Sequence, residues 1–161
     1  MTNYRIMKNL IIFMFTVLVC LGCKTSKAVL MHQAAFYGDA KVVQEYLNSG
    51  LDPNSMTLSG TTSLHSAAYR GNANIIELLL KNGANPNMVD GRGWIPLHQA
   101  VDQGHVGVVD MLIQSGSNVN AVMGASGYTA LDWSVIRQWP KVSDLIRKHG
   151  GKKITELHLS Q

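Results

Sequence analysis

One stretch, residues 93–121, decides the fold of this chain: Gly-Trp-Ile-Pro-Leu-His-Gln-Ala-Val-Asp-Gln-Gly-His-Val-Gly-Val-Val-Asp-Met-Leu-Ile-Gln-Ser-Gly-Ser-Asn-Val-Asn-Ala. Its opening at 95–100 follows a turn and predicts a short helix, which Gly104 breaks. The apolar residues within 108–113 recur at helical spacing and predict a second helix, which Gly116 ends. The stretch therefore encodes a unit of two short helices followed by a loop.

The same unit recurs along the chain at a period of 33 residues. Four marker positions agree in three copies: His32, His65 and His98; Gly38, Gly71 and Gly104; Gly50, Gly83 and Gly116; Asn54, Asn87 and Asn120. A fixed period of this length predicts a stack of repeats, in which each unit buries its apolar face against its neighbours. A fourth, altered copy follows at an offset of 34, with 131–134 in the histidine region and Gly150 as terminator.

These residues resemble the ankyrin repeat, whose Thr-Pro-Leu-His-x-Ala opening matches 95–100 and, nearly as well, 62–67. The resemblance implies an all-α solenoid of four stacked helix-turn-helix repeats joined by β-hairpin-like loops. We expect the repeats at about 28–55, 60–88, 93–121 and 127–151, followed by a C-terminal tail at 152–161. In the fourth copy, Ser143 and Arg147 replace apolar residues of the earlier copies, which is typical of a repeat that caps the stack.

The first 22 residues predict a signal peptide, because a basic start with Arg5 and Lys8 precedes a short apolar run at 10–21. That run is shorter than the roughly 20 residues that a membrane-spanning helix needs. Its end, Cys20-Leu21-Gly22-Cys23, resembles a bacterial lipobox, although Cys20 stands where an aliphatic residue is usual. The resemblance implies lipidation at Cys23, and plain secretion is the alternative.

A lipidated Cys23 would be followed by a short tether, 23–27, so the repeats would lie against a membrane surface. We therefore expect the cell envelope of a bacterium, on the periplasmic side. By the same resemblance, Lys24 favours an outer-membrane lipoprotein.

The composition and motifs argue against chemistry. The formal charge of +4 includes Arg5 and Lys8, so residues after the signal carry about +2, too little for a nucleic-acid footprint. Equivalent histidines of stacked layers lie roughly 10 Å apart, too far to share a metal ion; we expect them to bind loop backbone instead. No catalytic or phosphate-binding motif occurs. We therefore expect no enzyme activity, no cofactor and no metal.

A surface that binds another protein remains. The ankyrin resemblance implies a concave face built from the loop tips and from residues that close the first helix of each repeat. Carried over by position, the candidate residues are Tyr37, Leu58, Tyr69, Arg70, Arg92, Trp94, Asp102, Gln103, Tyr128 and Arg137. Tyr, Trp and Arg are enriched at interface hot spots. The alternative is that some aromatic residues, Phe36 in particular, only cover the edge of the stack.

Two functional hypotheses are open. In the first, the protein resembles small ankyrin lipoproteins that act as immunity proteins, blocking an antibacterial effector such as a phospholipase delivered by type VI secretion. In the second, it is an envelope scaffold or a stress-associated adaptor. Secretion into a host cell as an effector fits the repeats but does not fit a lipidated Cys23.

Overall fold

The computed structural model describes residues 26–158, and Cys23 with the predicted signal peptide lies outside them. Within the described residues the chain forms short α-helices: α2 (Lys27–Tyr37), α3 (Ala40–Asn48), α4 (Ser63–Arg70), α5 (Ala73–Lys81), α6 (Pro96–Asp102), α7 (Val106–Gln114), α8 (Ala130–Ile136), α9 (Pro140–Lys148) and α10 (Ile154–His158). In this part of the chain the only β pairing is an isolated bridge between Val122 and Thr129. No helix in 26–158 is long and apolar enough to cross a bilayer.

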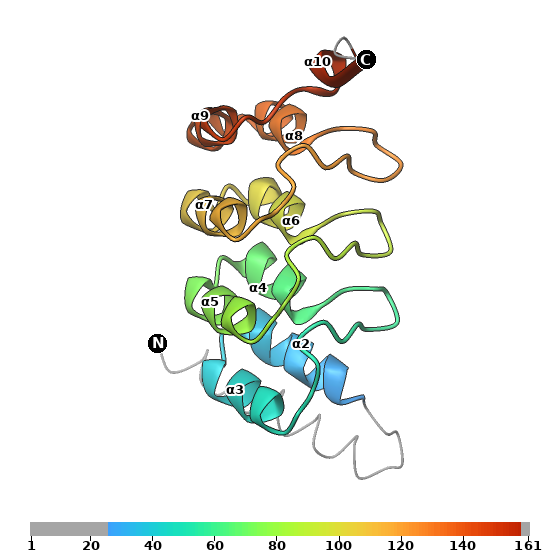
Figure 1. The fold of residues 1–161 in the computed structure, drawn as a ribbon, viewed down its shortest axis with the longest axis vertical. Helices are drawn as coiled ribbons and strands as arrows, with labels where there is room; N and C mark the ends of the chain where they lie inside the picture. The colour runs from blue at the N-terminus through green and yellow to red at the C-terminus, as the bar shows by residue number, and fades with distance from the viewer. Residues whose placement is uncertain (1–25, 159–161) are drawn as a thin grey trace, which may run out of the picture.

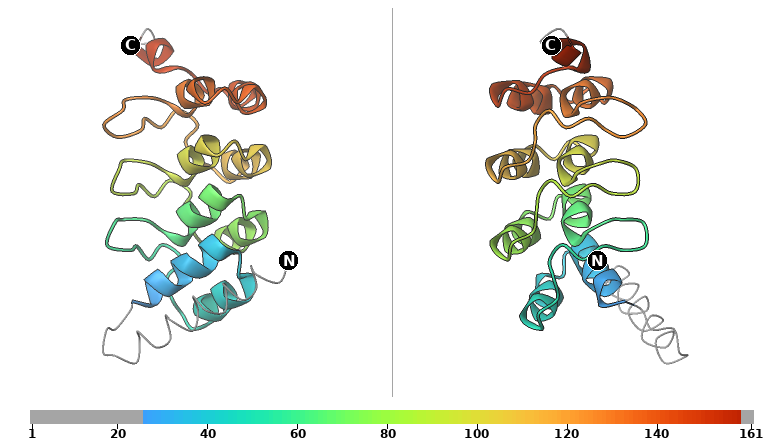
Figure 2. Two further views of the ribbon diagram at one scale, coloured as in Figure 1. Left: turned by 180° about the vertical axis from the view of Figure 1, so that it is seen from behind. Right: turned by 45° about the vertical axis from the view of Figure 1, so that its right-hand side comes forward.

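The helices stack in two columns (Figure 1). One column, here called the inner column, contains α2, α4, α6 and α8, and the outer column contains α3, α5, α7 and α9. The long loops between successive helix pairs all project from the same side, as Figures 1 and 2 show. The predicted all-α repeat solenoid is confirmed.

The core repeats as the sequence does. Leu64, Leu97 and Leu131 are buried at the same position of α4, α6 and α8. The outer column is similar, with Leu79, Leu112 and Ile146 all at 0 % exposure. Each layer therefore buries its apolar side chains against the layers before and after it, which gives a fold without a central core.

The fourth helix pair corrects one expectation. Arg147 is exposed, as a capping position should be, but Ser143 is buried. Its hydroxyl lies 2.8 Å from that of Ser134 on α8. A polar residue in this slot therefore reflects a hydrogen-bonded pair inside the last layer, and does not mark the outward edge of the stack.

The repeated histidines join each layer to the loop that follows. In His65, Nδ1 accepts from the backbone N–H of Thr62, so the proton is on Nε2, which donates to the carbonyl oxygen of Trp94 at 3.0 Å. His98 bonds in the same way to Ile95 and, at 3.1 Å, to the carbonyl oxygen of Ala121. The prediction that the histidines bind loop backbone is confirmed for His65 and His98.

The fourth layer makes the equivalent contact with a carboxylate. Asp132 accepts from the N–H of Thr129 within its own layer and from the N–H of Ile154 in the following segment. An imidazole can donate to a carbonyl oxygen, whereas an ionised carboxylate can only accept. The segment after α9 therefore presents an N–H where the earlier loops present a carbonyl oxygen.

The repeated asparagines make a second set of bonds between layers. The Asn87 amide donates to the carbonyl oxygen of Gly116 at 2.9 Å and accepts from the N–H of Asn118 at 2.7 Å. Asn54 and Asn120 form the same pair of bonds with the loops that follow them. Each asparagine thus satisfies one donor and one acceptor of the next layer.

The glycines that separate the two helices of a layer lie directly under the next layer. Gly71 has φ +72°, and a Cβ placed on it would lie 2.9 Å from the ring of His105. Gly104 is covered in the same way by the indole of Trp139. In the fourth layer Gln138 occupies this slot; it is exposed and has φ +59°.

Replacing Gly71 by Ala should lower the free energy of unfolding by about 2–4 kcal/mol, because strained backbone adds to the clash with His105. Gly83→Ala is the matched control: its φ is +87°, but nothing lies within 4 Å of the added Cβ. We expect the control to lose only about 1 kcal/mol. Urea denaturation of both variants measures this, and equal losses would show that the layer above does not require a glycine.

Acidic pH should lower the free energy of unfolding of the stack, because His98 is buried as the neutral ring. Burial lowers the pKa of His98 to about 4, below its ordinary 6.5, so the folded state holds the neutral ring. The unfolded chain then binds more protons below pH 6.5, and stability present above that pH is lost as the pH falls toward 4. Burial also lowers the pKa of His65 and of His32, which acts in the same direction.

We therefore expect the free energy of unfolding to fall by about 2 kcal/mol between pH 7 and pH 5 from His98 alone. His98→Gln keeps an N–H donor but does not titrate, so its unfolding should depend less on pH. Denaturant titrations at several pH values test this. If the free energy of unfolding depends on pH equally in the two proteins, the prediction is contradicted.

Candidate protein-binding surface

The candidate residues lie along the inner column and on the loops beside it, a surface called here the candidate face. The structure brings nine of the ten predicted residues into two clusters. The tryptophan cluster contains Arg92, Trp94, Asp102, Gln103, Tyr128 and Arg137, joined by Trp133. The phenylalanine cluster contains Tyr37, Tyr69 and Arg70, joined by Phe36.

Aromatic contacts hold the tryptophan cluster together. The ring of Trp133 on α8 lies edge-to-face with Trp94, with centroids 5.7 Å apart, and 6.2 Å from Tyr128. The guanidinium of Arg92 lies 4.8 Å from the Trp94 ring centroid, and that of Arg137 lies 5.6 Å from Trp133. Because these residues come from two loops and from α8, the cluster exists only when the layers are stacked.

Two aspartates fix the arginines of this cluster. Burial alone would raise the pKa of Asp90, but hydrogen bonds from the Trp94 N–H and from Arg92 outweigh it, so its pKa is lowered. Burial likewise opposes ionisation of Asp102, whose pKa is lowered by bonds from Trp133 and Arg137. Both carboxylates are therefore ionised at neutral pH and orient the guanidinium groups.

In the phenylalanine cluster, the rings of Phe36 and Tyr69 stack with centroids 6.1 Å apart across α2 and α4. The guanidinium of Arg70 lies 4.9 Å from the Phe36 centroid. Tyr37 and Tyr69 are 46 % and 38 % exposed, whereas Phe36 is half-buried. Phe36 thus supports the exposed residues of this cluster.

Leu58 stands apart from both clusters. It occupies the tip of the first loop and is fully exposed. No ring contact, ion pair or hydrogen bond links it to the other candidate residues in the part of the chain that the structure describes. Its role in binding stays a prediction, as does the role of the other nine residues.

The sequence analysis missed Trp133, the residue that joins the tryptophan cluster. The sequence analysis considered only the loop tips and the ends of the first helices, and Trp133 lies one turn before Arg137. Side chains four residues apart share one face of a helix. Applying that spacing to Arg137 would have identified Trp133 from the sequence.

One serine–histidine pair superficially suggests nucleophilic catalysis. The Ser66 hydroxyl on α4 lies 2.7 Å from Nδ1 of His32 on α2, in the preceding layer. Ser66 is only 3 % exposed, so a substrate cannot reach its oxygen. The pair therefore ties two layers of the inner column together.

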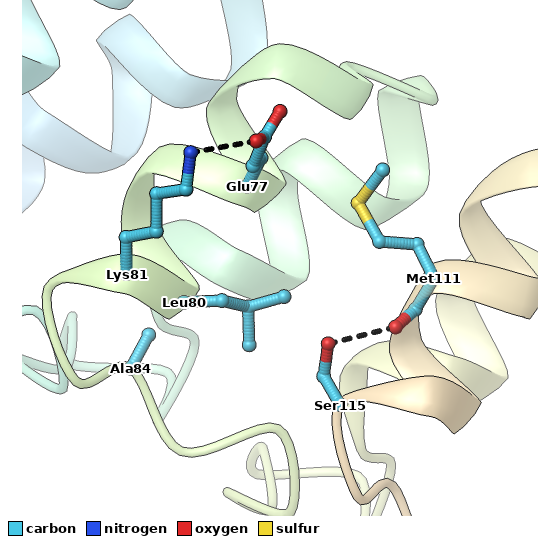
Figure 3. A pocket seen from close by; sticks show the side chains of 6 residues that line it. All are labelled: Glu77, Leu80, Lys81, Ala84, Met111 and Ser115. Atoms are coloured by element: carbon cyan, nitrogen blue, oxygen red, sulfur yellow. Dashed lines mark hydrogen bonds and ion pairs between the residues drawn. The ribbon is translucent and has the colours of Figure 1, made fainter.

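The outer column carries a shallow hollow of about 640 Å³ between α5 and α7, seen in Figure 3. It is lined by Glu77, Leu80, Lys81, Ala84, Met111 and Ser115. Glu77 is bound to Lys81 at 2.7 Å, and Ser115 donates to the carbonyl oxygen of Met111. The lining thus offers no nucleophile with an adjacent base, and no group of residues within 26–158 could hold a metal ion.

The stacked helix pairs and the aromatic and arginine side chains of one face define a repeat protein of the binding type. A model of ankyrin repeats, in three copies, matches residues 31–123, more than half of the chain. The protein belongs to the ankyrin-repeat family. Ankyrin repeats are protein-interaction modules and are generally non-enzymatic. No curated protein matches the sequence.

The helix pair α8–α9 lies beyond the matched residues. It nevertheless packs on α6 and α7 as the earlier pairs pack on each other. The fourth layer also supplies Trp133 and Arg137 to the tryptophan cluster. Three of the seven residues of the tryptophan cluster, Tyr128, Trp133 and Arg137, therefore come from the fourth copy.

Proposed function

We propose that this protein is a bacterial envelope lipoprotein that binds a partner enzyme through the candidate face and blocks it. The target would be a secreted antibacterial effector that acts on lipid, such as a phospholipase, and the protein would confer immunity to it. The alternative is an envelope scaffold or stress-associated adaptor with several weaker partners.

The order of the tryptophan cluster is the observation that carries the blocking role. Its arginines are held by ion pairs and by indole rings before any partner arrives. Preorganised side chains lose little conformational entropy on binding, which favours a tight complex. Tight, stoichiometric binding is what an inhibitor needs, whereas a scaffold can work with weaker contacts.

The position of the first helix supports the membrane part of the proposal. α2 begins at Lys27, and the hydroxyl of Ser26 caps it. Only residues 24–26 would separate a lipidated Cys23 from the cap-bearing helix, a span of about 10 Å when extended. A blocker held this close to the bilayer is well placed against an enzyme that attacks lipid.

The inhibitor role is tested with the product of a neighbouring lipase-like reading frame, if the genome has one. We expect a stable stoichiometric complex, loss of the hydrolase activity, and protection of cells that express both. Arg92→Ala or Trp94→Ala should weaken the complex by about 2 kcal/mol or more.

Arg147→Ala on α9 is the matched control, because Arg147 is an exposed arginine of the outer column, and it should leave the complex unchanged. Circular dichroism checks that the variants fold. Several partners of low stoichiometry in a pulldown would favour the scaffold, and no complex with no protection would refute the inhibitor role.

Lipidation predicts that Cys23→Ala releases the protein from the membrane fraction. Wild-type cells grown with radioactive palmitate should label the protein, and the variant should not be labelled. Equal distribution of both proteins between membrane and soluble fractions would contradict the lipoprotein assignment and favour plain secretion.

A further inference from the structure

The two arginines of the tryptophan cluster use only one edge of each guanidinium within the chain. Nε and Nη2 of Arg92 donate to Oδ2 of Asp90 at 3.1 and 2.9 Å. The same two atoms of Arg137 donate to Oδ1 of Asp102. Neither Nη1 donates to any residue within 26–158. Since a guanidinium has five N–H groups, three remain free on each arginine.

The partners of each ion pair differ sharply in exposure. The Arg92 side chain is 60 % exposed and that of Asp90 2 %, while the values for Arg137 and Asp102 are 44 % and 12 %. An approaching molecule therefore contacts the guanidinium groups and not the carboxylates.

The aspartates are also saturated with donors from this chain. Oδ1 of Asp90 accepts from the backbone N–H groups of Arg92 and Trp94. Asp102 accepts from the indole N–H of Trp133 and from the Gln103 amide. Neither carboxylate needs to release its arginine for the outer edge of the guanidinium to bind an anion.

Partly exposed indole rings lie between the two guanidinium groups. The successive distances from Arg92 to Trp94, from Trp94 to Trp133, and from Trp133 to Arg137 are 4.8, 5.7 and 5.6 Å. One short segment can therefore reach both guanidinium groups while an apolar side chain packs on the rings. Guanidinium groups bind carboxylates through two parallel hydrogen bonds.

We propose that this part of the candidate face binds an acidic segment of the partner protein. Two of its carboxylates bind the outer edges of Arg92 and Arg137, and an apolar side chain between them packs on Trp94 and Trp133. The inference rests on the proposed function, because it specifies the chemistry of the partner at the same face. Arg70, exposed beside Phe36 in the phenylalanine cluster, is a further guanidinium group on the candidate face.

Nucleic acid fits this surface less well. The three arginines of the two clusters are offset by Asp90 and Asp102, so their net charge is small. A nucleic-acid site needs many cations to neutralise phosphates along a strand. The indole rings and the few fixed guanidinium groups favour a polypeptide with scattered acidic residues.

The experiment selects random short peptides, displayed on phage, against the detergent-solubilised full chain. We expect enrichment of peptides in which Asp or Glu flanks an apolar residue. Binding of the selected peptides should weaken about tenfold or more in Arg92→Gln/Arg137→Gln and should weaken with added salt. Arg147→Gln/Lys148→Gln, which removes two exposed cations from α9, should bind them like the wild type.

Arg92→Lys/Arg137→Lys separates geometry from charge. It keeps both positive charges but cannot form two parallel hydrogen bonds, so it should also bind more weakly than the wild type. If the glutamine variant fails to fold, the lysine variant still tests the role of the two arginines. Thermal unfolding measured beside each binding curve identifies such a failure.

The outcomes distinguish this proposal from the proposed function. Selected peptides that lack acidic enrichment but lose binding in Trp94→Ala would overturn the acidic segment and leave protein binding at this face intact. Peptides bound equally well by the wild type, the glutamine variant and Trp94→Ala would overturn both. Unchanged binding in the glutamine variant alone would overturn the role of the two arginines.

Discussion

Hydrogen bonds between layers are the constraint on which the rest of this structure depends. A layer of two short helices has too few residues to form a core of its own, and its loops carry backbone groups that no helix satisfies. Asn87 provides the clearest case, since one side chain satisfies both a carbonyl and an N–H of the following loop. His65 and His98 supply further bonds of this kind from buried positions. The loops are therefore fixed in position by side chains of the preceding layer.

Fixing the loops has a direct effect on the candidate face. The histidine bond to Trp94 holds the residue whose indole contacts both Arg92 and Trp133 in the tryptophan cluster. The same loop carries Asp90 and Arg92, whose ion pair shapes the outer surface. A binding surface built on loops can therefore be as ordered as one built on helices, because buried polar groups hold its backbone. Residues far from the solvent thus determine the geometry of residues on the candidate face.

The period of the sequence was enough to predict the layers, because each marker serves a contact that every layer needs. The histidine, the asparagine and the covered glycine recur for this reason, but of their roles only the histidine's bond to loop backbone was expected from the sequence. The contacts of Trp133 and Arg137 with Asp102 could not be predicted, since they join residues of different layers that do not recur. The buried Ser143 was misjudged for a related reason: its partner, Ser134, occurs only in the last layer. Repetition predicts the scaffold, whereas the face depends on the departures from it.

The side chain at Gln138 limits how such a protein can lengthen. In the earlier layers a ring or amide of the following layer rests on the glycine at this point, as His105 does on Gly71. Gln138 places a Cβ there in a left-handed backbone conformation. A further unit joined after His158 would meet that atom before it could dock. A unit packed on the fourth layer in the way that the earlier layers pack on each other would therefore have to leave room for this side chain, which the glycines of the earlier layers do not require.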